Sequence, residues 1–262
     1  MEHITVASIK KKKGVEKIAM ITAYDALFAR LFDPLIDIIL VGDSLSMSFG
    51  GARDTLGITL DAMIYHTQAV CKASTRALVI LDMPFGSCST PEETLRNATR
   101  VYKESGAEAI KLEGGIEKAP SVALLVENGI AVMAHIGLKP QFVRAEGGYK
   151  IKGKTEEEKE SLLRDAKALE EAGAFSILLE GVKAEVARSI AEQVSIPVIG
   201  IGSGAGVDGQ VLVWSDLLGF EEQMKPKFVR TYAKGATWIR EGVRGYVDDV
   251  RSGAFPDETE SY

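Results

Sequence analysis

The sequence is poor in the features that mark exported and membrane-spanning proteins. It has only two cysteines, Cys71 and Cys88, which lie far apart and lack the spacing of a zinc site or a disulfide framework. No apolar run is long enough to cross a bilayer, and the first residues lack the apolar stretch of a signal peptide. The sequence therefore predicts a cytoplasmic protein with reduced thiols.

Positive charge is also scarce. The formal net charge is -6, and the one basic run is the KKKK at 10–13, which we interpret as a solvated face near the N-terminus. In contrast, 46% of the 262 residues are hydrophobic, which is enough to bury a large core. We expect a soluble globular protein with neither nucleic-acid nor membrane partners.

Short apolar runs recur along the chain and are separated by longer segments of helical period. Continuous apolar runs, unlike alternating ones, are typical of parallel strands that are covered on both faces. A chain of this length with eight such units favours a closed (β/α)8 TIM barrel over an open α/β sheet. The eight runs are 17–22, 36–42, 77–84, 108–115, 130–137, 175–181, 196–202 and 210–214.

Helix start and stop signals lie between these runs. A threonine before a helical segment is a good N-cap, and a glycine between a helix and the next strand is a good C-terminal cap. The region 227–250 predicts a final helix. We predict a single barrel domain over residues 1–262, with an N-terminal extension and a C-terminal helix. The candidate caps are Thr59, Thr90 and Thr155 at helix starts and Gly106, Gly129 and Gly173 at helix ends.

Polar residues stand where the predicted strands end, which is where βα barrels carry their chemistry. Carboxylates gathered at one rim repel one another unless something neutralises them, and a divalent cation does so. An oxygen-rich set without a His/Cys cluster favours Mg²⁺ over zinc. The strand-end residues are Asp43, Ser44, Asp82, Lys111, Glu113, His135 and Glu180.

Three of these residues suggest further roles. The two-residue period of a strand puts Lys111 and Glu113 on the same face, so that an ammonium beside a carboxylate can seat an anionic substrate next to a metal. Glu180 follows an apolar run, and apolar surroundings raise a carboxyl pKa, which suits a general base. The strand-end residues also have structural alternatives. Asp43 can cap a turn, the Lys111 and Glu113 side chains can form an ion pair, and Glu180 can be a solvated strand end.

Two connections also stand out. The segment 200–209 contains a formal G-x-G-x-x-G, but a strand-like run follows it, so a tight loop is the preferred interpretation and a phosphate site is the alternative. The connection 137–155 is long, and a loop of that length is functional or mobile. We predict that it acts as a lid.

The strand-end residues lie within motifs that resemble the ketopantoate hydroxymethyltransferase family over nearly the whole chain. The motifs are specific because they occur in order and with the spacing of the family. They are TAYD (22–25), LVGDS (40–44), TLDAMIYHTQAV (59–70), LDMPF (81–85), IKLEGG (110–115), AHIGLKPQ (134–141), GGYKIKGK (147–154), LLE (178–180) and IPVIGIGSGAGVDGQVLVWSDLLG (196–219).

This resemblance implies a barrel of the phosphoenolpyruvate/pyruvate type that binds Mg²⁺. It implies transfer of a hydroxymethyl group from 5,10-methylenetetrahydrofolate, as co-substrate, to 3-methyl-2-oxobutanoate, giving 2-dehydropantoate in pantothenate biosynthesis through a metal-stabilised enolate. It also implies a homo-oligomer, often a decamer, and assigns no folate contacts. By motif, Asp43, Asp82 and Glu113 are the metal-site carboxylates, Asp43, Ser44, Asp82 and Lys111 contact the keto acid, and Glu180 is the proton acceptor.

The segment 45–58 departs from the family pattern at Ser46, Ala52, Arg53 and Gly57, which bears on pocket shape and substrate selectivity.

Two alternative functions stay open. One is a Mg²⁺-dependent C–C lyase or mutase of the same superfamily acting on a 2-oxo acid, for which Cys88 is the candidate cysteine. The other is a non-catalytic barrel that binds small anions.

Overall fold

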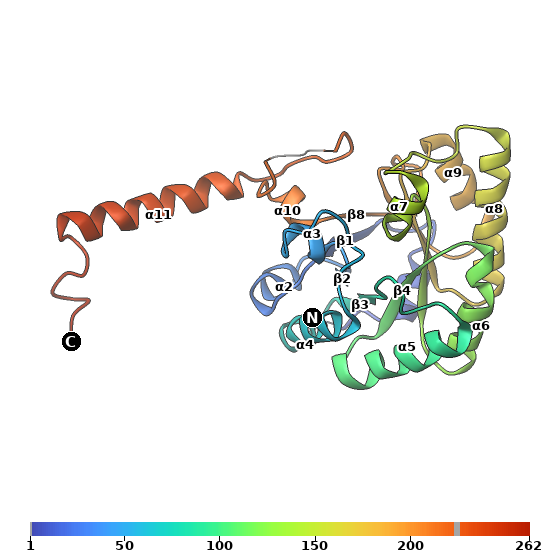
Figure 1. The fold of residues 1–262 in the computed structure, drawn as a ribbon, viewed down its shortest axis with the longest axis horizontal. Coiled ribbons are helices and arrows are strands. Elements are labelled where there is room, and N and C mark those ends of the chain that lie inside the picture. The colour runs from blue at the N-terminus through green and yellow to red at the C-terminus, as the bar shows by residue number, and fades with distance from the viewer. Residues whose placement is uncertain (1, 223–225) are drawn as a thin grey trace. The chain divides into compact units, whose positions relative to one another are not determined.

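Eight parallel strands close into a barrel in the computed structural model, which describes residues 2–222 and 226–262 (Figure 1). Each strand pairs with the next along the chain, and β8 closes the barrel against β1. The predicted (β/α)8 barrel is confirmed. The strands are β1 (Ile18–Thr22), β2 (Ile38–Val41), β3 (Leu78–Asp82), β4 (Ala109–Glu113), β5 (Val132–Gly137), β6 (Ser176–Glu180), β7 (Val198–Ile201) and β8 (Gly209–Leu212).

Helices connect the strands from β1 to β7, a loop connects β7 to β8, and α5, α6 and α8 cover the outside of the barrel (Figure 1). Thr59, Thr90 and Thr155 each cap a helix by accepting a backbone N–H, as predicted. The helices are α1 (Val6–Lys11), α2 (Ala26–Phe32), α3 (Leu45–Ser48), α4 (Leu60–Ala73), α5 (Pro91–Ser105), α6 (Ala119–Glu127), α7 (Val143–Glu146), α8 (Glu156–Glu171), α9 (Ala184–Gln193), α10 (Trp214–Leu217) and α11 (Gly235–Ser252), with 3₁₀ helices η1 (Ile116–Lys118) and η2 (Pro140–Phe142).

The chain divides into two compact units, residues 1–213 and residues 214–262. The first holds all eight strands, and the second holds α10 and α11. Within the second unit, the Trp214 and Phe220 rings meet edge to face, with centroids 5.1 Å apart. The predicted final helix is present as α11, which starts later than the predicted 227. Within residues 2–222 and 226–262, no helix is both long and apolar enough to cross a membrane.

The barrel core consists of the apolar runs that the sequence predicted as strands. Every residue of β2, β3, β4 and β5 is buried, because the barrel interior covers one face of these strands and the helices cover the other. Ile9 of α1 is also fully buried and joins the same cluster as Ile38 and Leu78. The N-terminal extension is therefore packed onto the core of the barrel.

The basic run near the N-terminus is not the fully solvated face that we predicted. Lys12 pairs with Asp37 and Lys13 pairs with Asp208, each at 2.8 Å, and all four side chains are largely buried. Asp208 also accepts the backbone N–H of Gly14. These ion pairs fix the extension to the strand-start end of the barrel, so only the first half of the run is solvated.

The connection after β5 is ordered and carries η2 and α7 rather than an unstructured loop. Its far end is tied to the barrel by a bridge between Lys152 and Val182. The segment 200–209 forms the tight loop that we preferred, since β7 ends at Ile201 and β8 begins at Gly209. Only glycine fits at position 209, because a Cβ atom there would lie 2.5 Å from the carbonyl oxygen of Ile18.

Asp33 holds the turn that leads into β3. Its carboxylate accepts the backbone N–H groups of Thr75, Arg76 and Ala77 at 2.8–3.1 Å. Burial opposes ionisation, but these N–H groups outweigh it and lower the pKa of Asp33. The Asp33→Ala change leaves the buried N–H of Ala77 and the partly buried N–H groups of Thr75 and Arg76 unpaired. We therefore expect the free energy of unfolding to fall by about 3 kcal/mol in urea titrations.

The pH dependence of this loss has a defined sign. A lowered folded-state pKa stabilises the protein above the unfolded value of about 3.9 and ceases to do so as the pH falls through the folded-state pKa. The stability gap between wild type and Asp33→Ala should therefore narrow in acid. Asp61→Ala, at an exposed residue of α4, is the matched control. A gap that stays constant down to acid pH would contradict this role of the charge.

Candidate functional site

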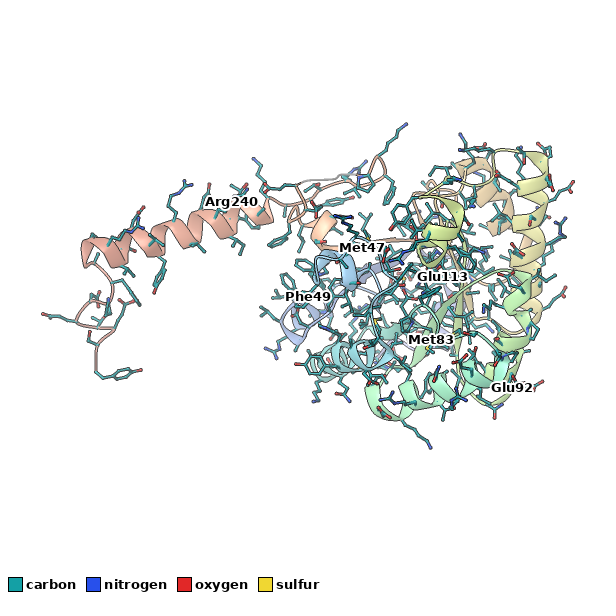
Figure 2. The ribbon with its side chains drawn as sticks, in the orientation of Figure 1. Met47, Phe49, Met83, Glu92, Glu113 and Arg240 are labelled. Carbon is teal, nitrogen blue, oxygen red and sulfur yellow. The ribbon has the colours of Figure 1, made fainter. Side chains whose placement is uncertain are left out.

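Strand register brings the predicted site residues together at one end of the barrel. Asp82 on β3 lies opposite Lys111 on β4, and Glu113 on β4 lies opposite His135 on β5. Two residues further along β5, Gly137 lies opposite Glu180 on β6. Because paired residues of parallel strands point to the same side, these side chains share one mouth. Glu113 lies within the barrel, whereas Glu92 lies at its periphery (Figure 2).

A buried ammonium lies among three carboxylates. Lys111 Nζ is 2.8 Å from Asp82 Oδ1, and both side chains are almost fully buried. Asp82 Oδ2 accepts the backbone N–H of Asp43 at 3.2 Å, which links the ends of β2 and β3. Burial lowers the pKa of Lys111, but Asp82, Glu113 and Asp43 outweigh it and raise that pKa. Lys111 therefore stays charged, but its single positive charge does not balance the three carboxylates if all of them are ionised.

The two aspartates respond to this excess of negative charge. Burial and the neighbouring Asp82 raise the pKa of Asp43 well above its ordinary value. Burial also raises the pKa of Asp82, against the opposing effect of Lys111. The cluster therefore favours either uptake of protons or the presence of a further cation.

His135 joins this cluster to Glu180. Its Nδ1 is 3.1 Å from Lys111 Nζ and 3.5 Å from Glu113 Oε1, and its Nε2 is 3.4 Å from Glu180 Oε2. Burial and Lys111 lower the pKa of His135, but Glu113 and Glu180 outweigh them and raise it to about 9. In turn, His135 overcomes the burial of Glu113 and lowers its pKa. The sequence placed His135 at the rim but gave it no role.

Glu180 differs in one respect from the prediction. Its side chain is 22% exposed and faces His135, so its surroundings are less apolar than the preceding run suggested. Gly137 allows Glu180 to take this position, since it has φ +100° and a Cβ atom there would lie 2.3 Å from the Glu180 carbonyl oxygen. The base candidate thus lies at the open edge of an otherwise buried cluster.

Ser44 begins α3, directly after Asp43. Its hydroxyl lies 2.9 Å from the hydroxyl of Tyr24, which is fully buried. Tyr24 belongs to the TAYD motif, so the ends of β1 and β2 meet at this point. This contact fixes the serine hydroxyl next to Asp43, where it can donate to an anionic ligand.

Gln141, on η2, is a site residue that the sequence reasoning missed. Its side-chain Nε2 donates to Asp43 Oδ2 at 3.0 Å and to the carbonyl oxygen of Met83 at 2.9 Å. Its backbone N–H donates to Glu113 Oε2 at 3.2 Å. The only sequence signals were its place in the GLKPQ motif and in the long connection after β5.

The donor set fits a hard divalent cation. Asp82 Oδ1 is paired with the Lys111 ammonium at 2.8 Å, and Glu113 Oε1 is buried 3.5 Å from His135 Nδ1 without a hydrogen bond. Carboxylate oxygens are the ligands that such a cation prefers. Within the described part of the chain, no three His, Cys, Asp or Glu side chains converge as a ready metal cage. This agrees with Mg²⁺, which keeps several waters and takes one or two carboxylates together with substrate oxygens. Direct ligation by Asp43, Asp82 and Glu113 together stays a prediction.

Cys88, the candidate cysteine of the lyase alternative, is a poor source of thiolate. Burial raises the pKa of its thiol, and Lys118 donates to its carbonyl oxygen.

His66, on α4, contacts the carbonyl oxygen of Tyr24 at 2.6 Å and packs against the Phe49 ring. Its role is therefore one of packing next to the site.

Comparison with solved structures supports the fold. A phosphonopyruvate hydrolase, solved in complex with oxalate and Mg²⁺, superposes with a TM-score of 0.62 at 14% identity, covering 98% of this chain and 93% of that one. A 2,3-dimethylmalate lyase of the PEP mutase/isocitrate lyase superfamily gives a TM-score of 0.61 at 17% identity, covering 98% and 91%. These likenesses support the (β/α)8 fold.

Comparison of sequences gives the family. The chain is 70% identical to 3-methyl-2-oxobutanoate hydroxymethyltransferase of Wolinella succinogenes over the full length of both proteins. It is 56% identical to the enzyme of the same name from Helicobacter hepaticus, covering 100% of this chain and 99% of that protein. The family model described as ketopantoate hydroxymethyltransferase matches residues 3–258. The chain belongs to the ketopantoate hydroxymethyltransferase family.

Proposed function

We propose that the protein transfers a hydroxymethyl group from 5,10-methylenetetrahydrofolate to 3-methyl-2-oxobutanoate and so produces 2-dehydropantoate for pantothenate biosynthesis. The observation that carries the proposal is the 70% identity, over the whole length of both proteins, with a curated enzyme of that name. The overall reaction also consumes one water, whose oxygen becomes the new hydroxyl group, and releases tetrahydrofolate.

The buried cluster supplies the binding groups of this proposal. Lys111 and Ser44 are placed to bind the carboxylate and keto oxygens of the substrate, since one carries a buried positive charge and the other a fixed hydroxyl. Asp43, Asp82 and Glu113 would hold Mg²⁺, with Asp43 and Asp82 also close enough to contact the substrate. When bound, Mg²⁺ acts as a Lewis acid that polarises the keto group.

Glu180 is the proposed general base. It removes the proton from C3 of the keto acid, and the electron pair of that C–H bond becomes the nucleophile that forms the new C–C bond. His135 Nε2 lies 3.4 Å from Glu180 Oε2, so it is placed to orient the base. The Glu180 side chain is partly exposed, so the one-carbon donor could reach C3 of the keto acid from that side.

The test is turnover of 3-methyl-2-oxobutanoate with 5,10-methylenetetrahydrofolate in Mg²⁺ and after treatment with a chelator. We expect 2-dehydropantoate in the first case, loss of the product in the second and recovery when Mg²⁺ is returned. A matched substrate control is 3,3-dimethyl-2-oxobutanoate, which has no proton on C3 and should give no product. Absence of product from 3-methyl-2-oxobutanoate under every condition would favour the lyase or the anion-binding alternative.

Three further expectations are part of the same proposal. They are a homo-oligomeric state, with a decamer as the form that the family resemblance implies, a cytoplasmic location and the folding of both compact units as one domain. Sedimentation velocity tests the first. The loss of soluble protein when residues 214–262 are deleted would support the last.

A further inference from the structure

We propose that Gln141 is a positioning residue that couples closure of the 137–155 connection over the barrel mouth to the orientation of Asp43 and Glu113, and thereby to cation binding. The coupling to a cation rests on the proposed function. The contacts themselves do not, because they join the connection to strand ends whatever the reaction.

Gln141 contacts the ends of three strands at once. Its amide donates to Asp43 after β2 and to the Met83 carbonyl after β3, and its backbone donates to Glu113 on β4. An amide NH₂ group has two hydrogens, so both side-chain donors are used. No movement of η2 away from the mouth can keep all three of these bonds.

These bonds orient the carboxylates without neutralising them. Gln141 donates to Oδ2 of Asp43 and to Oε2 of Glu113, while Glu113 Oε1 faces His135 Nδ1 at 3.5 Å without a hydrogen bond. A neutral donor fixes the rotation of each carboxylate and leaves its negative charge and its second oxygen for a cation. Partners of this kind, one step removed from a metal, commonly set its affinity.

The outer contacts of the connection are weaker. Arg144 donates to Asp54 Oδ2 through Nε and Nη2, at 3.1 and 3.0 Å, but its side chain is 74% exposed. The Tyr149 hydroxyl lies 3.7 Å from Met47 Sδ. Exposed ion pairs contribute little, whereas hydrogen bonds to buried charged groups contribute much more. The inner contact of Gln141 is therefore expected to dominate closure.

The experiment compares wild type with Gln141→Met, which keeps the length of the side chain and removes its donors. The matched control is Gln193→Met, at the end of α9, where the amide bonds only to Ser189. Calorimetric titration with Mg²⁺ alone should show a dissociation constant raised about 10- to 100-fold in Gln141→Met and unchanged in Gln193→Met. Hydrogen exchange of the backbone at 139–148 should be faster in Gln141→Met only.

A second variant separates positioning from general disruption. Arg144→Ala removes an outer contact, so it should raise exchange at 139–148 slightly and leave Mg²⁺ affinity unchanged. In turnover, Gln141→Met should raise the Mg²⁺ concentration for half-maximal rate while kcat at saturating Mg²⁺ stays within a few-fold of wild type. If Gln141→Met does not fold, Gln141→Asn keeps the amide but shortens its reach, and the same measurements apply to it.

The outcomes that test the role of Gln141 differ from those that test hydroxymethyl transfer. Equal Mg²⁺ affinity and equal exchange in wild type and Gln141→Met would overturn the role of Gln141 even if the keto acid is turned over. Conversely, a weakened Mg²⁺ affinity with faster exchange supports the role even if no hydroxymethyl transfer is found. A wild type that does not bind Mg²⁺ would overturn the coupling to a cation.

Discussion

Replacing Glu180 with glutamine is expected to reduce turnover by about 10²- to 10⁴-fold, while affinity for 3-methyl-2-oxobutanoate changes little. Glutamine keeps the size and the hydrogen-bonding reach of the side chain but cannot accept a proton at neutral pH. Against burial and Lys111, the neighbouring carboxylates raise the pKa of His135, 3.4 Å away, to about 9, so it is not expected to replace the base at neutral pH. The two readouts, binding and turnover, should therefore separate.

Proton abstraction can be followed without the folate. Wild type in deuterated water should exchange the C3 proton of the keto acid, a change that NMR detects, and Glu180→Gln should not. Glu127→Gln, at the exposed end of α6, is the matched control and should behave as wild type. Exchange that persists in Glu180→Gln within tenfold of wild type would assign the base to another residue. Unchanged binding and phenotype in Glu180→Gln would favour the non-catalytic barrel.

Replacing Lys111 with methionine should have the largest effect on stability. Methionine fills a similar volume, but it leaves Asp82, Glu113 and Asp43 buried without the ammonium that lies among them. Breaking a buried ion pair from one side costs about 3–5 kcal/mol. We expect a loss of that size in the free energy of unfolding, together with loss of turnover, because the binding group for the keto acid is removed.

The pH dependence of the free energy of unfolding of Lys111→Met tests this prediction. Lys111 opposes the rise in the pKa of Asp82, so its removal should raise that pKa further. A carboxyl group whose pKa is higher in the folded state binds protons preferentially in that state, so the variant should gain stability as the pH falls toward the unfolded value of about 3.9. Denaturant titrations at several pH values measure this.

A double mutant completes the test. Adding Asp82→Asn should recover part of the stability that Lys111→Met loses, since it removes one of the charges left unpaired. Lys10→Met, at an exposed position of α1, is the control for loss of a lysine. Additive effects of Lys111→Met and Asp82→Asn, with no recovery, would rule out this account of the cluster.

The fold was predictable because the physical signals in the sequence are local. Ile38–Val41 and Leu78–Asp82 are continuous apolar runs, and only a strand covered on both faces buries such a run completely. Most predicted strands extended one or two residues beyond their observed ends. Many of those extra residues are glycines at the turns, such as Gly42, Gly114 and Gly181, where strand pairing has stopped.

The site was predictable to the extent that it lies on strands. The two-residue period placed Lys111 and Glu113 on one face, and the register of β3 and β4 then brought Asp82 to Lys111. The contacts of Gln141 were not predictable, because they depend on how a long connection folds back over the mouth. The pairing of Lys12 with Asp37 was missed for the same reason, since residues far apart in sequence meet only in the closed barrel.

The pairing of β1 with β8 has a consequence for synthesis on the ribosome. All of the residues assigned to the reaction have left the exit tunnel once Glu180 has, but the edges of β1 and β7 stay unpaired until Gly209–Leu212 follows. Open strand edges readily pair with other chains. The nascent polypeptide is therefore most prone to misassembly while β8 is still in the exit tunnel, after the residues assigned to the reaction have already left it.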